Sequence, residues 1–304
     1  MLLAPKLSKA TEQLIYLKKR VRLTKDEENF LYNGEQGFKG EKSFAAFIEN
    51  SLGKDCNILY DVLLEYQNTY FQIDALLIQA ESVHIFEIKH FNGDYIYQDQ
   101  NFYKLKSKKK VKNPFHQLQR TEDLLREYLH SHQLTCTIHS YVVFNHPYFT
   151  LYQAPVFPNM ILPAQQQRFM QTFQNNSQRF SPQTQKIQNL IQTKHLNETP
   201  FEYKPAYSLD QLKKGIFCLK CSQEMKQKNN NKMYCTSCAN MESISSVILR
   251  QTVEYSVLFS DQKIQTRAIY QWCDEQIPMK AVRRILNKYL KKSSKTKASY
   301  FEFM

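Results

Sequence analysis

Two short apolar runs in the first third of the chain give its clearest pattern. Residues 71–78 and 83–88 are rich in Phe, Ile, Leu and Val, and the polar segment 79–82 separates them. Runs of this length and composition, bounded by polar residues, predict two neighbouring β-strands joined by a tight turn. We therefore expect the fold to be organised around residues 71–89.

Apolar positions at helical and strand spacing continue on both sides of this pair. Residues 33–40 hold three of the six glycines and predict a loop, and Phe44, Phe47 and Ile48 then predict a helix over 41–52. Further strands are expected at 57–64, 94–105, 136–144 and 159–162, and further helices at 117–130 and 165–173. This order predicts an α/β core with a central mixed sheet flanked by helices.

The two ends of the chain have other patterns. Residues 1–34 look helical and are expected to pack on the domain that follows them. Residues 174–210 are rich in Gln, Asn, Ser and Thr and predict a linker with a marginal helix near 186–191. Beyond residue 245 the apolar spacing predicts mainly helices, at 246–259, 266–273 and 278–289.

Charged residues interrupt the two central strands. Side chains alternate across a strand, so Glu87 and Lys89 emerge on the same face. Asp74 stands between apolar neighbours, where a carboxylate costs several kcal/mol unless it is paired or bound to a metal. Asp74 and Glu87 offer hard oxygen ligands for Mg²⁺ or Mn²⁺, and Lys89 can position a water or offset charge on phosphorus. The layout suits metal-assisted phosphodiester chemistry.

A plainer interpretation of the same residues stays open. Glu87 and Lys89 could form a solvated ion pair, which contributes about 0.2–1 kcal/mol in a sheet. The position of Asp74 between apolar residues favours the metal site over this alternative.

The motifs in this order resemble the PD-(D/E)xK restriction-endonuclease-like nucleases, and more closely their nuclease-related branch, the NERD domain. The similarity spans roughly residues 37–175. It rests on Gly-x-x-Gly-Glu at 37–41, Gln-Ile-Asp at 72–74, Phe-Glu-Ile-Lys at 86–89 and Asn-Pro-Phe-His-Gln at 113–117. The resemblance implies a catalytic core that uses Asp74, Glu87 and Lys89.

Two further residues receive a role only through this resemblance. It implies that Glu41 lies beside the metal site and that Gln117 holds the scissile phosphate or a water. Otherwise, Glu41 is explained by the favourable helix dipole at a first turn, and Gln117 by an ordinary helix surface. The chain departs from the family pattern at Ile73, which stands where the leading proline would be.

Composition adds a charge asymmetry. The chain of 304 residues is long enough for two or three domains, and 42% of its residues are hydrophobic. Its net charge is +13, of which residues 153–304 carry +12. A basic segment after the metal-binding core suggests that one part holds a polyanion while another cuts it, although solubility alone would also explain the charge.

The N-terminus has no apolar run of the kind that a signal peptide or a membrane span needs. We therefore expect a cytoplasmic protein without a membrane partner.

Four of the seven cysteines form two knuckles, Cys218-x-x-Cys221 and Cys235-x-x-Cys238, with thirteen residues between them. Two such pairs place four thiolates around Zn²⁺ at about 2.3 Å and leave no open position for water. An odd number of cysteines without a secretion signal argues for reduced thiols rather than disulfides. The segment predicts a structural zinc ribbon.

The last predicted helix carries a basic surface. Its apolar residues recur at helical spacing, and the helix before it is close, so the pair resembles a helix-turn-helix whose second helix enters the DNA major groove. The residues 291–303 could form a wing hairpin, and a helical hairpin with a solvated basic face is the alternative. The candidate nucleic-acid-binding residues are Lys280, Arg283, Arg284 and Lys288.

Together these patterns predict five segments: a helical appendage (1–34), a NERD nuclease-like domain (35–175), a polar linker (176–212), a zinc ribbon (213–244) and a basic helix-turn-helix or winged-helix-like domain (245–304). The predicted function is a metal-dependent nuclease acting on nucleic acid, with DNA favoured and the basic C-terminal region binding the substrate. The rival is a non-catalytic nucleic-acid-binding or regulatory protein with a nuclease-like scaffold. The sequence leaves the oligomeric state open.

Overall fold

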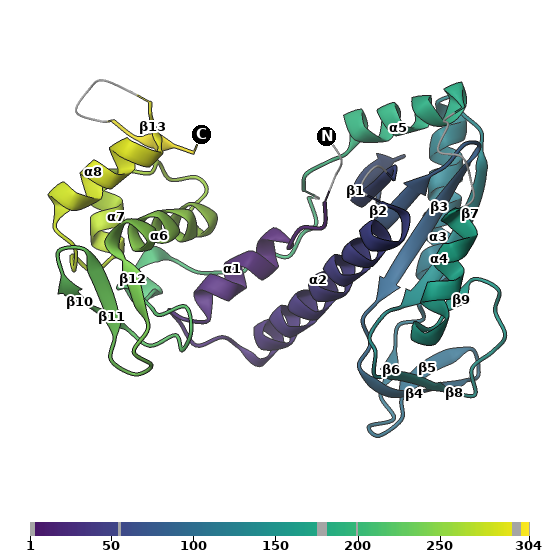
Figure 1. The fold of residues 1–304 in the computed structure, drawn as a ribbon, viewed down its shortest axis with the longest axis horizontal. Helices are drawn as coiled ribbons and strands as arrows, with labels where there is room; N and C mark the ends of the chain where they lie inside the picture. Colours follow the sequence, from purple (N-terminus) through teal and green to yellow (C-terminus); the bar gives the residue numbers. More distant parts are fainter. Residues whose placement is uncertain (1–3, 54–55, 175–180, 199, 294–298, 304) are drawn as a thin grey trace. The chain divides into compact units, whose positions relative to one another are not determined.

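The structure is a computed structural model that describes residues 4–53, 56–174, 181–198, 200–293 and 299–303 (Figure 1). The chain forms two compact units. The first combines residues 1–7 with 32–202, and the second combines 8–31 with 203–304. The boundary between them falls within helix α2, Lys25–Leu52.

The first unit contains a five-stranded mixed sheet in the order β1-β2-β3-β7-β9. Neighbours are antiparallel from β1 to β3 and parallel from β3 to β9. The strands are β1 (Ile58–Tyr66), β2 (Thr69–Ile78), β3 (Ser82–Lys89), β7 (Thr137–Phe144) and β9 (Met160–Ile161). The predicted α/β class with a central mixed sheet is confirmed, and the expected central pair is β2 and β3.

Helices cover both faces of this sheet (Figure 1). On one face, α3 (Pro114–Ser131) and α5 (Pro182–Lys194) pack in a core with β-strand residues such as Ile85. On the other, α2 and α4 (Gln166–Gln174) pack in a core with Phe86. The alternation of Ile85 and Phe86 between two cores explains why β3 is apolar on both sides.

A smaller sheet in the order β6-β5-β4-β8 completes this unit. Its strands are β4 (Gly93–Gln98), β5 (Asn101–Lys104), β6 (Lys110–Val111) and β8 (Phe149–Tyr152). Phe149, the first residue of β8, stacks on Phe144, the last residue of β7, with ring centroids 4.4 Å apart. This contact packs the small sheet against the large one.

Two segments of the first unit differ from expectation. Residues 33–40 are not a loop, because α2 runs through them without a break. Residues 182–194 form α5, whose Ile187 and Ile191 are fully buried, so the marginal helix predicted near 186–191 is longer than expected and packs into the core. Ile187 and Ile191, with Leu190 packed beside them, dock a helix whose other residues are mostly polar. The predicted linker residues 176–180 lie outside the described part.

The second unit joins helices to a small sheet in one hydrophobic core. The helices are α1 (Lys9–Leu17), α6 (Ile244–Leu258), α7 (Thr266–Trp272) and α8 (Met279–Tyr289). The strands are β10 (Met225–Asn229), β11 (Lys232–Cys235) and β12 (Met241–Ser243), followed by the hairpin β13 (Lys291–Lys292) and β14 (Phe301–Glu302). Helix α1 belongs to this core through Leu14 and Leu17, whereas we expected it to pack on the domain that follows it.

A buried arginine explains why the N-terminal segment joins this unit. Arg20 Nε lies 2.5 Å from Glu254 Oε1 on α6, and its side chain is fully buried. The guanidinium also donates to Gln251 Oε1 at 2.7 Å and to the Lys213 carbonyl at 2.7 Å. Its carbon atom lies 3.7 Å from the centre of the Trp272 ring. One residue thus ties α1 to α6, α7 and the chain before the small sheet.

Among the described residues, no helix is both long and apolar enough to cross a membrane.

The arginine contact predicts a large loss of stability on truncation. Arg20→Ala leaves Glu254 buried without its partner, and breaking a buried ion pair costs about 3–5 kcal/mol. Arg22→Ala is the matched control, because Arg22 is exposed and surface changes usually stay within about 0.5 kcal/mol. Chemical denaturation of both variants measures the difference, and equal small losses would contradict the role given to Arg20.

Candidate functional site

The carboxyl end of β3 brings the predicted residues of the first unit together. Lys89 Nζ lies 2.5 Å from Glu87 Oε1 and donates to Gln117 Oε1 on α3 at 3.5 Å. The hydrogen-bonded pairing of β2 with β3 ends at the Ala75–Phe86 pair, and Asp74 is the first residue of β2 beyond it. Its Oδ2 accepts a hydrogen bond from the Ile88 amide at 2.7 Å, so the side chain replaces the missing backbone acceptor.

Hydrogen bonds at the end of β3 hold α2 so that Glu41 lies near Asp74 and Glu87. The Asn145 side chain donates to the Gly40 carbonyl at 2.7 Å, and its Oδ1 lies 2.8 Å from His90 Nδ1. A Cβ atom at Gly40 would lie only 2.6 Å from His90 Cβ, which is closer than real Cβ contacts come. Gly40 therefore lets α2 approach β3, and the next residue along the helix is Glu41.

The carboxylates of this site repel one another in a buried setting. Burial, together with the charges of Asp74, Asp61 and Glu87, raises the pKa of Glu41 to about 8, and Lys89 opposes the rise. Burial also raises the pKa of Glu87 to about 7, with Asp74 adding to the rise and Lys89 opposing it. The pKa of Asp74 is raised as well, by burial. Without a cation, the site favours protonated carboxyl groups.

Sequence reasoning missed three residues of this region. Asp61 on β1 has a left-handed backbone with φ of 53°, and its Oδ1 accepts from Gln72 Nε2 at 2.5 Å. Burial raises the pKa of Asp61 to about 6, and Asp74 is among the charges that raise it. The second and third are His90, which we interpreted as a packing or surface residue, and Asn145. Asp61 could have been found from the predicted strand pair, because Asp61 and Asp74 lie between the paired positions Tyr60–Ala75 and Val62–Ile73 of two adjacent strands.

The donor set fits a hard divalent cation. Glu87 is only 3% exposed, and its Oε1 forms an ion pair with Lys89. Carboxylate oxygens are the ligands that Mg²⁺ prefers, and Mg²⁺ is usually held by one or two carboxylates while waters and substrate phosphates supply the rest. Asp74 and Glu87 match that pattern. In the described part of the chain, a cluster of three or more close ligand atoms occurs only at the cysteines.

The four cysteines of the second unit form that cluster. Their Sγ atoms all lie within 4.8 Å of one another. Each knuckle turns back through a residue with positive φ directly after its second cysteine, Ser222 in one and Ala239 in the other. The Lys220 amide lies 3.4 Å from Cys218 Sγ, as a donor to that sulfur. Four convergent thiols could hold one zinc ion with no position left open.

Helix α8 has a buried apolar side and an exposed basic side. Val282, Ile285 and Leu286 are buried in the core of the unit. The four basic candidates, Lys280, Arg283, Arg284 and Lys288, are all exposed. After α8, β13 pairs with β14, and Phe301 of β14 also bridges to Ile264. Helices α6, α7 and α8 are thus followed by a hairpin within the same unit.

Comparison with known proteins identifies the first unit. Residues 36–145 match the family model of the nuclease-related domain, NERD. The chain therefore contains a nuclease-related domain, and the matched segment includes Glu41, Asp74, Glu87, Lys89 and Gln117. No curated protein and no solved structure matches the chain.

The raised pKa of Glu41 predicts how stability depends on pH. The folded state holds this proton between the ordinary pKa and about 8, so Glu41 makes stability fall as pH rises through that window. In magnesium-free buffer at pH 8.5, we expect Glu41→Gln to be more stable than the wild type by about 1–3 kcal/mol. At pH 5 the two should melt alike.

Thermal melts at both pH values measure this difference. Glu49→Gln is the matched control, because Glu49 is an exposed residue of the same helix. A gain for Glu41→Gln that is equal at the two pH values, or that Glu49→Gln reproduces, would contradict the buried-carboxylate account.

Proposed function

We propose that this chain is a metal-dependent nuclease that hydrolyses phosphodiester bonds of nucleic acid, with DNA favoured as the substrate. One observation carries the proposal: in a nuclease-related domain, Asp74, Glu87 and Lys89 meet at one strand end. Desolvated carboxylates that raise one another's pKa are costly to keep, so their presence favours a role in binding a cation.

Asp74 and Glu87 would hold Mg²⁺ or Mn²⁺. When bound, such an ion acts as a Lewis acid on the phosphate and lowers the pKa of a coordinated water. In the reaction, the oxygen of a water would form the new bond to phosphorus while the bond to the leaving sugar oxygen breaks. The water would lose its proton to solvent, and the leaving oxygen would take a proton from solvent. The protein's own groups must therefore orient the water and balance the developing negative charge.

Lys89 and its neighbours serve that purpose. The Lys89 ammonium would orient the attacking water and offset negative charge on the phosphate oxygens. Gln117 fixes the ammonium from α3, and its amide nitrogen remains as a donor toward a phosphate oxygen. Glu41 would act in support, as a further carboxylate beside the charges of Asp74 and Glu87.

The second unit would bind the substrate. The exposed basic residues of α8 lie on the helix that enters the major groove in helix-turn-helix proteins. A zinc ion in the cysteine cluster would be structural, since four thiolates leave no site for water. Residues 203–304 of this unit hold 18 basic and 8 acidic residues, a net charge of +10 that favours phosphate binding.

A second candidate function rests on Ile73, which replaces the proline of the family pattern. The domain would then be a scaffold in a non-catalytic nucleic-acid-binding or regulatory protein. Such a protein has no need of a divalent ion at Asp74 and Glu87, so metal dependence separates the two candidates.

Cleavage assays test the nuclease proposal. Labelled single- and double-stranded DNA and RNA are incubated with the protein in Mg²⁺, in Mn²⁺ and without either ion. We expect cleavage that requires the ion and falls at least about a hundredfold in Asp74→Asn and Glu87→Gln, since each loses a charged ligand. Lys89→Ala should lose rate while still binding the ion.

Glu81→Gln is the matched control, because Glu81 is an exposed carboxylate in the turn between the same two strands. It should cleave like the wild type, and DNA affinity should be similar in all these variants. Absence of ion-dependent cleavage on every substrate, with intact DNA binding, would support the scaffold alternative instead.

The cysteine cluster predicts one zinc ion per chain. Elemental analysis of protein purified without chelators should find about one equivalent, because four close thiols bind Zn²⁺ tightly. Cys235→Ser should lose the metal and unfold the second unit, while Cys136→Ser, which lies on the first unit, should keep both. Zinc-free wild-type protein that melts unchanged would refute this assignment.

A further inference from the structure

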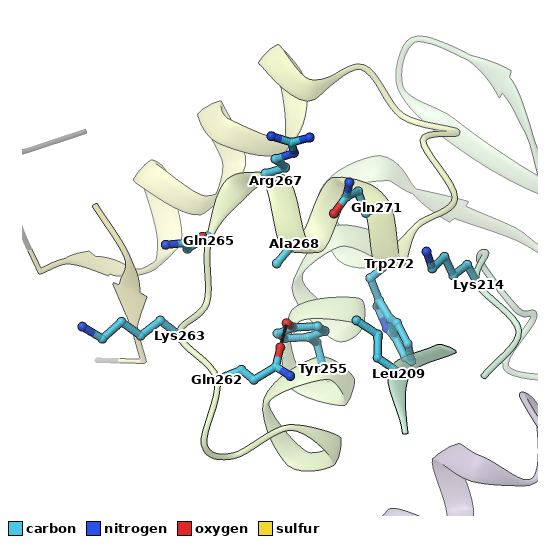
Figure 2. A pocket seen from close by; sticks show the side chains of 10 residues that line it. All are labelled: Leu209, Lys214, Tyr255, Gln262, Lys263, Gln265, Arg267, Ala268, Gln271 and Trp272. Atoms are coloured by element: carbon cyan, nitrogen blue, oxygen red, sulfur yellow. Dashed lines mark hydrogen bonds between the residues drawn. The ribbon is translucent and has the colours of Figure 1, made fainter. Parts of the chain in front are cut away.

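A pocket in the second unit, apart from the candidate nuclease site, is lined by basic and amide side chains. Its volume is about 400 Å³. Figure 2 shows its lining side chains, which come from α6, α7, the segment between them and the chain before the small sheet. The volume falls within the 300–1,000 Å³ of small-molecule sites. It is larger than a lone phosphate requires.

Three cations line this pocket and no carboxylate does. Lys214, Lys263 and Arg267 are exposed, and none makes an ion pair with a described residue. Lys263 is held in place, because its Nζ lies 4.5 Å from the centre of the Tyr300 ring. Three uncompensated positive charges around one hollow repel each other, and an anion would relieve that repulsion.

The uncharged polar side chains of the pocket can also donate hydrogen bonds. Tyr255 donates its hydroxyl proton to Gln262 Oε1 at 2.5 Å, which occupies the acceptor of that amide and leaves its nitrogen as a donor. Trp272 is 1% exposed, and its Nε1 donates to no described residue. Gln265 and Gln271 add two more side-chain amides at the rim. Cations and amide donors together match a group that offers only acceptors.

We propose that this pocket binds a phosphate ester. Such a group has acceptor oxygens, a charge that suits the three cations, and an attached sugar or nucleoside that would account for the volume. The ester could be a phosphate of the nucleic-acid backbone or that of a free nucleotide. The first source rests on the proposed function of the second unit as a nucleic-acid binder, and the second does not.

Trp272 supplies the measurement, since it is the single tryptophan of the chain and it lines the pocket. Its emission is followed while full-length protein is titrated with inorganic phosphate, adenosine monophosphate or a short DNA duplex. A saturable change is expected with at least one of the two esters. Lys263→Gln combined with Arg267→Gln should weaken it at least about tenfold, since charge-assisted hydrogen bonds are lost.

Lys226→Gln combined with Lys228→Gln is the matched control, because it removes two exposed cations from β10 of the same unit. It should leave the titration unchanged. Thermal melts show whether each variant is folded.

The ligand that produces the change identifies the source. A response to adenosine monophosphate that survives Arg283→Ala with Arg284→Ala indicates a free-nucleotide site. A response to the duplex alone, weakened by the pocket variant, indicates a backbone site. No change with any ligand up to millimolar concentration, or equal loss in pocket and control variants, would overturn the proposal. The readout needs neither Mg²⁺ nor cleavage, so it can fail or succeed independently of the nuclease activity.

Discussion

The first unit depends on one constraint, the burial of several carboxylates beside a single lysine at the end of β3. Asp74 and Glu87 project from adjacent strands, and Glu41 arrives from α2. Burial raises the pKa of all three, so the charged site opposes folding. The apolar cores on both faces of the sheet supply the stability that holds this arrangement together.

That constraint also explains several details of the surrounding structure. Gly40 is required where α2 meets His90, since any larger residue would push Glu41 away from the strands. The Asn145 side chain links the Gly40 carbonyl to the His90 ring. The backbone N–H of Asn145 donates to the Lys89 carbonyl at 3.1 Å. The helix, β3 and the end of β7 are therefore held together at the point where the carboxylates meet.

Much of this fold was predictable from the sequence, because its signals are local. The apolar runs predicted β2 and β3, and the C-x-x-C spacing predicted the thiol cluster. Contacts between distant segments gave no such signal. Three glycines predicted a loop at 33–40, yet the helix continues, since packing outweighs the propensity cost of about 1 kcal/mol per glycine. Likewise Arg20, one basic residue among several, is buried against Glu254, 234 positions away.

Proton release on metal binding tests the central claim most directly. Zinc-loaded protein in weakly buffered solution at pH 7 is titrated with Mn²⁺, while heat and pH are recorded. Because Glu41 and Glu87 have pKa values of about 8 and about 7, binding should release about one proton per Mn²⁺. Glu87→Gln should bind Mn²⁺ more weakly and release fewer protons. Mn²⁺ binding without proton release, or no binding at all, would contradict a metal site at these carboxylates.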